Sequence, residues 1–319
     1  MSNIFINLIF IAFGFLLLIK GADLFVDGMS STAINYKIPK LIISLSIVAF
    51  GTSSPELAIS FQGLLNGTGD VVLANVVGST IVNTLMIIGI ASIIRPIKVK
   101  NETIKKQLPL HLVIIIIFAL LFLLDNTISR LDALVLVSAF LYFVYYIYKF
   151  AKSKKNSVNE NDDDGEAKWP TVKAIIFSII GLAAIIFGSD IAVDNCVSLA
   201  SSVGISEKVI TMVVLVIGTS APELVLAVTS AKKNEFDIVL GNIIGTNIFN
   251  IGFVLGLPVL LLGSVTSFDF TFVDMFAMLI AGLYLFLYSR DDKLLTRKEG
   301  IFMVLTFLMY YIYIILNGI

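Results

Sequence analysis

The sequence contains little of the chemistry on which soluble enzymes depend. Its 319 residues include one cysteine, Cys196, and one histidine, His111. This excludes a disulfide framework, a zinc or iron–sulfur cluster and a Cys/His nucleophile pair. Only 14% of the residues are charged, against about a quarter in an ordinary soluble domain. The net charge of −1 offers no basic surface for nucleic acid. We expect His111 and Cys196 to be incidental residues at interfacial positions.

Long apolar runs take the place of that chemistry. Hydrophobic residues make up 58% of the chain, and the mean hydropathy is +0.98. A bilayer core about 30 Å thick requires roughly 20 apolar residues for each spanning helix. The sequence therefore predicts an all-α integral membrane protein with ten transmembrane helices. The ten runs lie near residues 4–20, 39–65, 71–94, 109–124, 132–150, 172–190, 208–231, 238–262, 271–289 and 300–317.

One polar stretch, residues 151–170, divides the chain into two halves, residues 1–150 and 171–319. Its charge and low hydrophobicity predict a solvated linker, although its acidic cluster (Asp162, Asp163, Asp164 and Glu166) would also suit a regulatory calcium site. Of the 22 Lys and Arg residues, 20 lie near loops that follow odd-numbered spans, and positive charge is retained on the cytoplasmic side. We therefore expect a multi-pass protein of the plasma membrane, with both termini extracellular and the linker in the cytoplasm.

The two halves carry the same motif at a fixed distance. Gly-Thr-Ser-X-Pro-Glu-Leu occurs at residues 51–57 and again at residues 218–224, an offset of 167. Without gaps, residues 51–89 and 218–256 are identical at 14 of 39 positions. Because each half holds five spans, the second half enters the membrane upside down relative to the first. Two inverted five-helix repeats are an architecture of secondary transporters, in which the substrate binds near the midplane between the halves.

Each copy of the motif places a glutamate, Glu56 or Glu223, at membrane depth. An ionisable side chain is costly there and by default marks a pathway or a site. The preceding glycine and proline disrupt helical hydrogen bonding, so we expect the second and seventh helices to be broken. A broken helix leaves carbonyl oxygens that can face a cavity. The candidate cation ligands of this kind are the backbone carbonyls of Ala49, Thr52, Val216 and Thr219.

Polar stripes on the third and eighth spans supply further oxygen atoms. Positions four residues apart share one face of a helix. The stripes are Asn75, Ser79 and Asn83 in the first half, and Asn242, Thr246 and Asn250 in the second. Carboxylate, hydroxyl and amide oxygens without thiol or imidazole suit Ca²⁺ or Na⁺ better than zinc or copper. For Asn75 and Asn242, at the stripe ends, we favour hydrogen bonding between helices. For Asp23 and Asp190 we favour helix-end or loop roles.

The paired pattern Gly-Thr-Ser-x-Pro-Glu and Asn-x-x-Gly-Ser/Thr-x-x-x-Asn resembles the two α-repeats of the Ca²⁺/cation antiporter superfamily, particularly the prokaryotic sodium/calcium exchangers. The resemblance implies that Glu56 and Glu223 are the central Ca²⁺ ligands and also coordinate Na⁺. It implies alternating access by sliding of the first and sixth spans across a fixed core. The other implied ligands are the carbonyls of Thr52 and Thr219, flanking sodium sites at Ser53, Ser79, Ser220 and Thr246, and Asn83 and Asn250 in the middle of the site.

We therefore expect a secondary active antiporter that exchanges Na⁺ for Ca²⁺, functions as a monomer in the lipid bilayer and has no covalent cofactor. Ca²⁺ and Na⁺ are its transported substrates, and nucleic acid is not a partner. A Ca²⁺/H⁺ antiporter is the alternative, because buried glutamates can carry protons. A cation channel is a more remote one, because channels usually build their pores from several subunits. An enzyme is not expected, since an intramembrane hydrolase with Ser53 or Ser220 as nucleophile would lack a His or Lys base.

Overall fold

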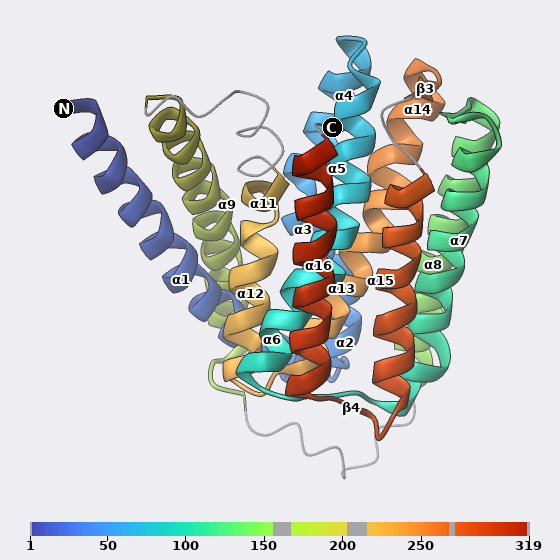
Figure 1. The fold of residues 1–319 in the computed structure, drawn as a ribbon. Helices are drawn as coiled ribbons and strands as arrows, with labels where there is room; N and C mark the ends of the chain where they lie inside the picture. The colour runs from blue at the N-terminus through green and yellow to red at the C-terminus, as the bar shows by residue number, and fades with distance from the viewer. Residues whose placement is uncertain (1, 156–166, 203–215, 268–271, 318–319) are drawn as a thin grey trace.

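The computed structural model describes residues 2–155, 167–202, 216–267 and 272–317 (Figure 1). These residues are helical apart from short connections and four two-residue strands. Eight of their helices are long and apolar enough to cross a membrane, and a ninth is counted if the bent pair Lys40–Thr52 and Pro55–Leu65 forms one span. A multi-pass, all-helical membrane protein is thereby confirmed. The start of the seventh predicted span, near residue 208, and the acidic cluster of the linker lie outside the described residues.

Two interrupted helices form the centre of the bundle. Each consists of an α-helix, a π-helical segment and a second α-helix. In the most apolar 18-residue stretch of each interrupted helix, 83% of the residues are buried inside the protein. The corresponding share for the N-terminal helix is 22%. Polar side chains on these two helices are therefore shielded from lipid. The segments are α5 (Gly69–Ile81), η2 (Val82–Ile87) and α6 (Ile88–Ile94) in the first half, and α13 (Phe236–Phe249), η5 (Asn250–Leu255) and α14 (Gly256–Leu262) in the second.

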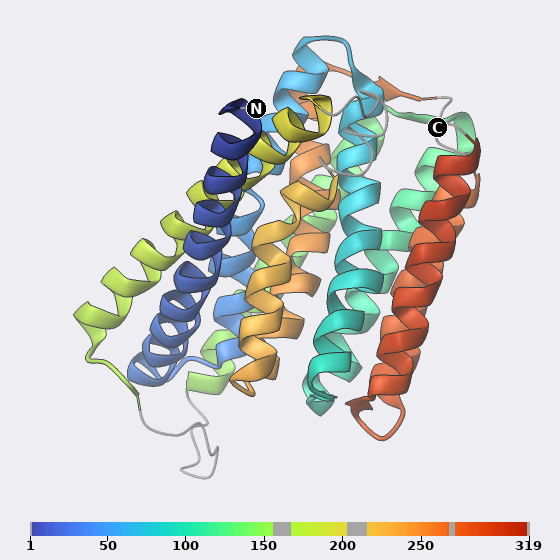
Figure 2. The same ribbon diagram turned by 60° about the vertical axis from the view of Figure 1, so that its left-hand side comes forward.

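Helices α1 (Ser2–Tyr36) and α9 (Thr171–Ser202) lie side by side at one edge of the bundle (Figures 1 and 2). Glycines allow their backbones to touch. A Cβ atom added at Gly181 would lie 2.6 Å from the backbone nitrogen of Phe25. Small residues at such contacts let membrane helices approach closely, and close packing is the main attraction available between helices in lipid.

Both edge helices are longer than the runs 4–20 and 172–190 predicted for them. As a result, Asp23 and Asp190 lie well inside α1 and α9, and their predicted helix-end positions are wrong. Lys233, which follows α12, pairs with two acidic residues of α1. Its Nζ lies 3.3 Å from Asp23 and 2.6 Å from Asp27.

The remaining long helices pack around the centre. Helix α16 contacts α6, α15 contacts α7 and α14 contacts α8. Two short antiparallel strand pairs join loops of the first half to loops of the second, β1 with β4 and β2 with β3. Helix α1 begins and α16 ends on the side of the molecule where β3 lies, opposite β4 (Figure 1). The bounds are β1 Ile97–Lys98, η3 Thr103–Gln107, α7 Leu108–Asp125, β2 Thr127–Ile128, α8 Arg130–Lys155, β3 Val265–Thr266, α15 Phe272–Arg290, β4 Leu294–Leu295 and α16 Arg297–Asn317.

Candidate cation site

The two buried glutamates follow breaks in helical geometry, as the prolines before them predict. The first broken helix runs through α2 (Lys40–Ile43), η1 (Ser44–Val48) and α3 (Ala49–Thr52), and continues as α4 (Ser54–Leu65) after a bend of 46°. Ser53 interrupts it with φ −91° and ψ 9°. Ser220 repeats this conformation, φ −89° and ψ 6°, between α11 (Val216–Thr219) and α12 (Ala221–Lys232). The proline stands in the first turn of the helix that follows, where its missing N–H is not needed.

This arrangement places a carboxylate at the start of each second helix. Glu56 and Glu223 lie in the first turns of α4 and α12, and each is 1% exposed. The N-terminal end of a helix carries a partial positive charge, whereas the C-terminal end of the preceding segment presents carbonyl oxygens. Each break therefore brings an anion and carbonyl dipoles to the same depth, which is suited to holding a cation between them.

The central helices complete the surroundings of both glutamates. Helix α4 packs against α5 and η5, and α12 packs against α13 and η2. The helix that carries Glu56 is therefore next to the segment that begins with Asn250, and the helix that carries Glu223 is next to the segment that contains Asn83. Ser79 lies in α5 and Thr246 in α13. The glutamate-bearing helix of each half thus packs against a segment of the other half that carries a predicted amide ligand.

Many predicted ligands present a buried polar atom with no hydrogen-bond partner among the described residues. An unpaired buried polar group costs about 1–3 kcal/mol, so their concentration beside the two breaks is unfavourable unless something else binds them. The atoms are Glu56 Oε2, both carboxylate oxygens of Glu223, Asn83 Oδ1, both amide atoms of Asn250, and the hydroxyl oxygens of Ser53, Ser79, Ser220 and Thr246.

The predicted carbonyl ligands are placed differently. The carbonyl of Ala49 already accepts a hydrogen bond from the Ser53 amide at 3.1 Å, and the Thr52 hydroxyl lies 3.4 Å from it. The hydroxyl of Thr52 also lies 3.2 Å from the carbonyl of Val48. Val216 and Thr219 are the first and last residues of α11, on the matching side of the second break. Thr52 and Thr219 thus end the helical segments that precede the breaks.

Asn75 and Asn242 connect the central helices to the first broken helix. The amide Nδ2 of Asn75 donates to the carbonyl of Glu56 at 3.4 Å, and the hydroxyl of Thr52 donates to Oδ1 of Asn242 at 3.5 Å. Hydrogen bonding between helices is the role that their positions at the ends of the stripes predict. These contacts hold the backbone on both sides of the first break.

The charge of the site limits what it can bind. The described residues contain no group of three or more His, Cys, Asp or Glu side chains that could hold a metal ion. A cation would be held here by two carboxylates and by neutral oxygens, which is the coordination chemistry of Ca²⁺ and Na⁺. Two ionised carboxylates balance one Ca²⁺ or two Na⁺, so the two occupancies compete.

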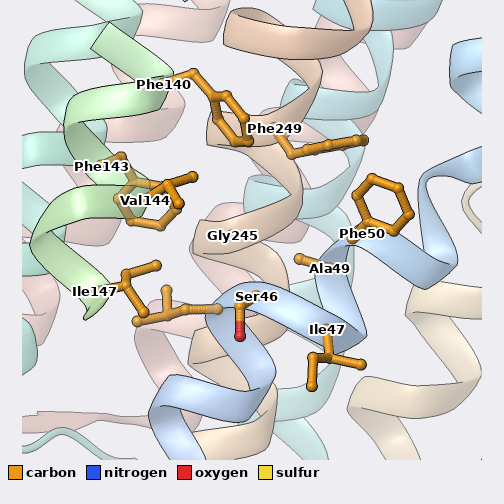
Figure 3. Close-up of a pocket in the computed structure, with 11 residues that line it drawn as sticks. Ser46, Ile47, Ala49, Phe50, Phe140, Phe143, Val144, Ile147, Gly245 and Phe249 are labelled. Atoms are coloured by element: carbon orange, nitrogen blue, oxygen red, sulfur yellow. The ribbon is translucent and has the colours of Figure 1, made fainter. Parts of the chain in front are cut away.

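An apolar pocket of about 310 Å³ lies behind the first broken helix, between η1, α8 and α13 (Figure 3). Ala49 is the predicted ligand that lines it, together with Gly245 and several phenylalanines. Its polar side chain, Ser46, donates to the carbonyl of Ile42 at 2.7 Å. The pocket therefore offers hydrocarbon surface, which does not suit a cation.

The structure adds a buried polar cluster that the sequence did not predict, formed by Asn247, Thr84 and His111. The Nδ2 atom of Asn247 lies 2.9 Å from the hydroxyl of Thr84 and 3.2 Å from Nε2 of His111. His111 is 0% exposed and takes part in this cluster, a contact that the sequence did not predict. Thr80 occupies the position of Asn247 in the first repeat, so repetition of residues does not single out Asn247 in the sequence.

Comparison with known proteins follows the same division of the chain. The family described as "Sodium/calcium exchanger protein" matches residues 6–149 and 173–316. CaxA of Alkalimonas amylolytica is 36% identical over 95% of this chain and 96% of its own length. The Ca(2+)/H(+) antiporter ChaA of Bacillus subtilis is 26% identical over 78% of this chain and 79% of its own. A solved structure of the sodium-calcium exchanger NCX_Mj has a TM-score of 0.84 at 27% identity, covering 96% of this chain and 97% of that one. The chain is therefore a multi-pass membrane protein that belongs to the sodium/calcium exchanger family.

Proposed function

We propose that this protein is a secondary active antiporter that exchanges Na⁺ for Ca²⁺ by alternating access, with Glu56 and Glu223 as the central ligands of the cation. The observation that carries the proposal is the concentration of partnerless buried oxygens on the predicted ligands, beside two helix breaks. Bound cations would satisfy these atoms. The flanking hydroxyls of Ser53, Ser79, Ser220 and Thr246 and the carbonyls of Ala49, Thr52, Val216 and Thr219 complete the proposed ligand set, with Asn83 and Asn250 between the glutamates.

The proposed architecture has ten spans in two inverted repeats, residues 1–150 and 171–319, joined by the linker 151–170. The short strands support it. An offset of 167 residues carries β2 onto β4 and makes β1 overlap β3, and each strand pairs with a strand from the other half. The two pairs lie on opposite sides of the molecule, as an inverted repeat requires (Figure 1). From the distribution of Lys and Arg we infer extracellular termini and a cytoplasmic linker in the plasma membrane.

Competition between Ca²⁺ and Na⁺ for the same two carboxylates would couple the binding of one ion to the release of the other. Ca²⁺ and Na⁺ cannot both neutralise the same pair of charges, so binding of one favours release of the other. Any further Na⁺ would have to bind through neutral oxygens, which the four flanking hydroxyls supply. Names of similar proteins include both a sodium-calcium exchanger and a Ca(2+)/H(+) antiporter. We propose Na⁺ coupling because the neutral hydroxyl groups next to the carboxylates can coordinate additional Na⁺ ions. An exchanger of Ca²⁺ for protons would need only the carboxylates.

The proposal is tested by uptake of radioactive Ca²⁺ into proteoliposomes loaded with Na⁺ and diluted into sodium-free buffer. A parallel sample without Na⁺ receives an imposed pH gradient. Uptake only with internal Na⁺ supports Na⁺/Ca²⁺ exchange, whereas uptake driven by the pH gradient alone overturns it in favour of Ca²⁺/H⁺ exchange. Single-channel currents would instead indicate a channel.

The ligand assignment is tested in the same assay. Glu56→Gln and Glu223→Gln keep the size of the side chain but remove its charge, and each should abolish Ca²⁺ uptake. Asp292→Asn is the control, because Asp292 is exposed in the turn before β4. Wild-type flux in both glutamine variants would show that the cation binds elsewhere.

A further inference from the structure

A chain of hydrogen bonds connects His111 to the proposed cation site. His111 in α7 contacts Asn247 in α13, and Asn247 contacts Asn83 in η2, whose Nδ2 donates to Asn247 Oδ1 at 3.2 Å. None of the three is more than 1% exposed. Water cannot replace these contacts, and buried polar networks of this kind fix the orientation of their members.

The chemistry of the groups sets the direction of each hydrogen bond. An amide nitrogen can only donate, so Nε2 of His111 accepts from Asn247 and the ring is neutral. The hydroxyl of Thr84 can donate or accept, and therefore tolerates either orientation of the Asn247 amide. In this arrangement the neutral ring carries its proton on Nδ1, which has no partner among the described residues. In this tautomer the lone pair of His111 Nε2 tolerates only one orientation of the amide. With Nδ2 of Asn247 turned toward the histidine, its Oδ1 must face Asn83.

The orientation of Asn247 determines which amide atom of Asn83 is available to the proposed cation site. Because its Nδ2 is occupied by Asn247, its Oδ1 is left buried and without a partner among the described residues. If Asn247 were reversed, Asn83 would have to turn its oxygen toward Asn247 and its NH₂ group toward the cation. An NH₂ group cannot coordinate a cation, so the orientation decides whether Asn83 is a ligand.

We propose that His111 is a positioning residue, which acts through Asn247 to make Asn83 present its carbonyl oxygen to the transported cation. This inference rests on the proposed function. Among the described residues, the corresponding hydrogen-bond chain is not formed around Asn250, the counterpart of Asn83. Thr80 occupies the place of Asn247, and its hydroxyl donates to Val76 in its own helix at 2.8 Å. Both amide atoms of Asn250 are without a partner in the described part of the chain. The two asparagines are therefore not equivalent, and only Asn83 has a fixed orientation.

The test measures binding of Ca²⁺ and Na⁺ as the rise in melting temperature of the purified protein, together with Ca²⁺ uptake. His111→Leu removes the acceptor and should raise the half-saturating Ca²⁺ concentration about fivefold to tenfold. His111→Gln can restore an acceptor through its carbonyl oxygen and should return the value to within about twofold of the wild type. Asn247→Ala breaks the chain at its middle and should match His111→Leu. It also serves as the second variant if His111→Leu does not fold.

Two double mutants separate positioning from a merely structural effect. Residues that act through one another have non-additive effects, whereas independent ones add. His111→Leu should therefore weaken Ca²⁺ binding no further in an Asn83→Ala background, and should keep its full effect in an Asn250→Ala background. Equal effects in both backgrounds, or no effect of His111→Leu, would overturn the inference. A wild-type protein that no cation stabilises would instead refute the proposed function.

Discussion

The Nζ atom of Lys233 lies 2.6 Å from Oδ1 of Asp27, which ties the loop after α12 to the C-terminal part of α1. Asp27 also pairs with Lys168 at 2.5 Å, and Lys233 also pairs with Asp23 at 3.3 Å. The contacts between these charges lie at one end of the molecule, between the α1–α9 pair and the helix that carries Glu223. They form a polar attachment between these two parts, to which Ser30 of α1 adds a hydrogen bond to Glu235 at 2.8 Å.

Replacing Asp27 with asparagine should therefore lower the stability of the protein. Two lysines would lose their shared partner, and because all of these groups are partly exposed the loss is about 1 kcal/mol. For a chain of this size this corresponds to a fall in melting temperature of about 2–4 °C. Thermal unfolding in detergent measures it, and the difference should shrink at high salt, which screens exposed charges. Lys105→Met, at an exposed lysine of η3, is the control. A fall that high salt leaves unchanged would contradict the electrostatic explanation.

The attachment shows how far the sequence could predict the fold. Apolar runs, helix breaks and the offset of 167 residues are local or periodic signals, so the central helices were predicted to within about two residues. The length of α1 was underestimated because Asp23 and Asp27 interrupt its apolar run. Their charges are compensated by Lys233, more than 200 residues away, and no local pattern contains that information.

The same reasoning applies to the candidate site. The glutamates and the polar stripes were predictable because repetition singles them out from an apolar background. His111 and Asn247 have no repeated counterpart of the same type, and they are 136 positions apart, so their contact cannot be read from the sequence. Repetition therefore reveals what the two halves share, whereas the features that make them different require the folded structure.

Replacing Gly181 with valine should separate α1 from α9. Its added Cβ atom would lie 2.6 Å from the backbone nitrogen of Phe25, a distance that backbone atoms cannot accommodate without moving. Overpacking of this kind costs about 1–3 kcal/mol, so we expect a clear fall in melting temperature and slower Ca²⁺ uptake. Ile179→Val is the control, because Ile179 is 63% exposed on the same helix. A melting temperature equal to that of the wild type would show that the two helices can move apart at no cost.

Replacing Thr246 with valine should have opposite effects on stability and on sodium binding. The hydroxyl of Thr246 is buried without a partner among the described residues, so its removal should leave the melting temperature in sodium-free buffer unchanged or slightly higher. Loss of a neutral oxygen ligand should at the same time raise the half-saturating Na⁺ concentration several-fold, with a smaller effect on Ca²⁺.

The matched control for this variant is Thr80→Val. The Thr80 hydroxyl is equally buried but donates to Val76 at 2.8 Å. Its removal should destabilise the protein by about 1 kcal/mol and leave Na⁺ dependence unchanged. If the two variants behave alike, Thr246 is not a sodium ligand.

Replacing Asn250 with aspartate should favour Ca²⁺ over Na⁺. The change adds a third carboxylate to a site that already holds Glu56 and Glu223, and attraction to a divalent ion grows twice as fast with added charge as attraction to a monovalent ion. Both amide atoms of Asn250 are without a partner among the described residues, so the substitution breaks no hydrogen bond there. We expect the half-saturating Ca²⁺ concentration to fall about tenfold, while the maximal exchange rate also falls because release of Ca²⁺ becomes slower. Asn101→Asp adds the same charge at an exposed position and should change neither quantity. An unchanged Ca²⁺ affinity in Asn250→Asp would place this residue outside the coordination sphere of the cation.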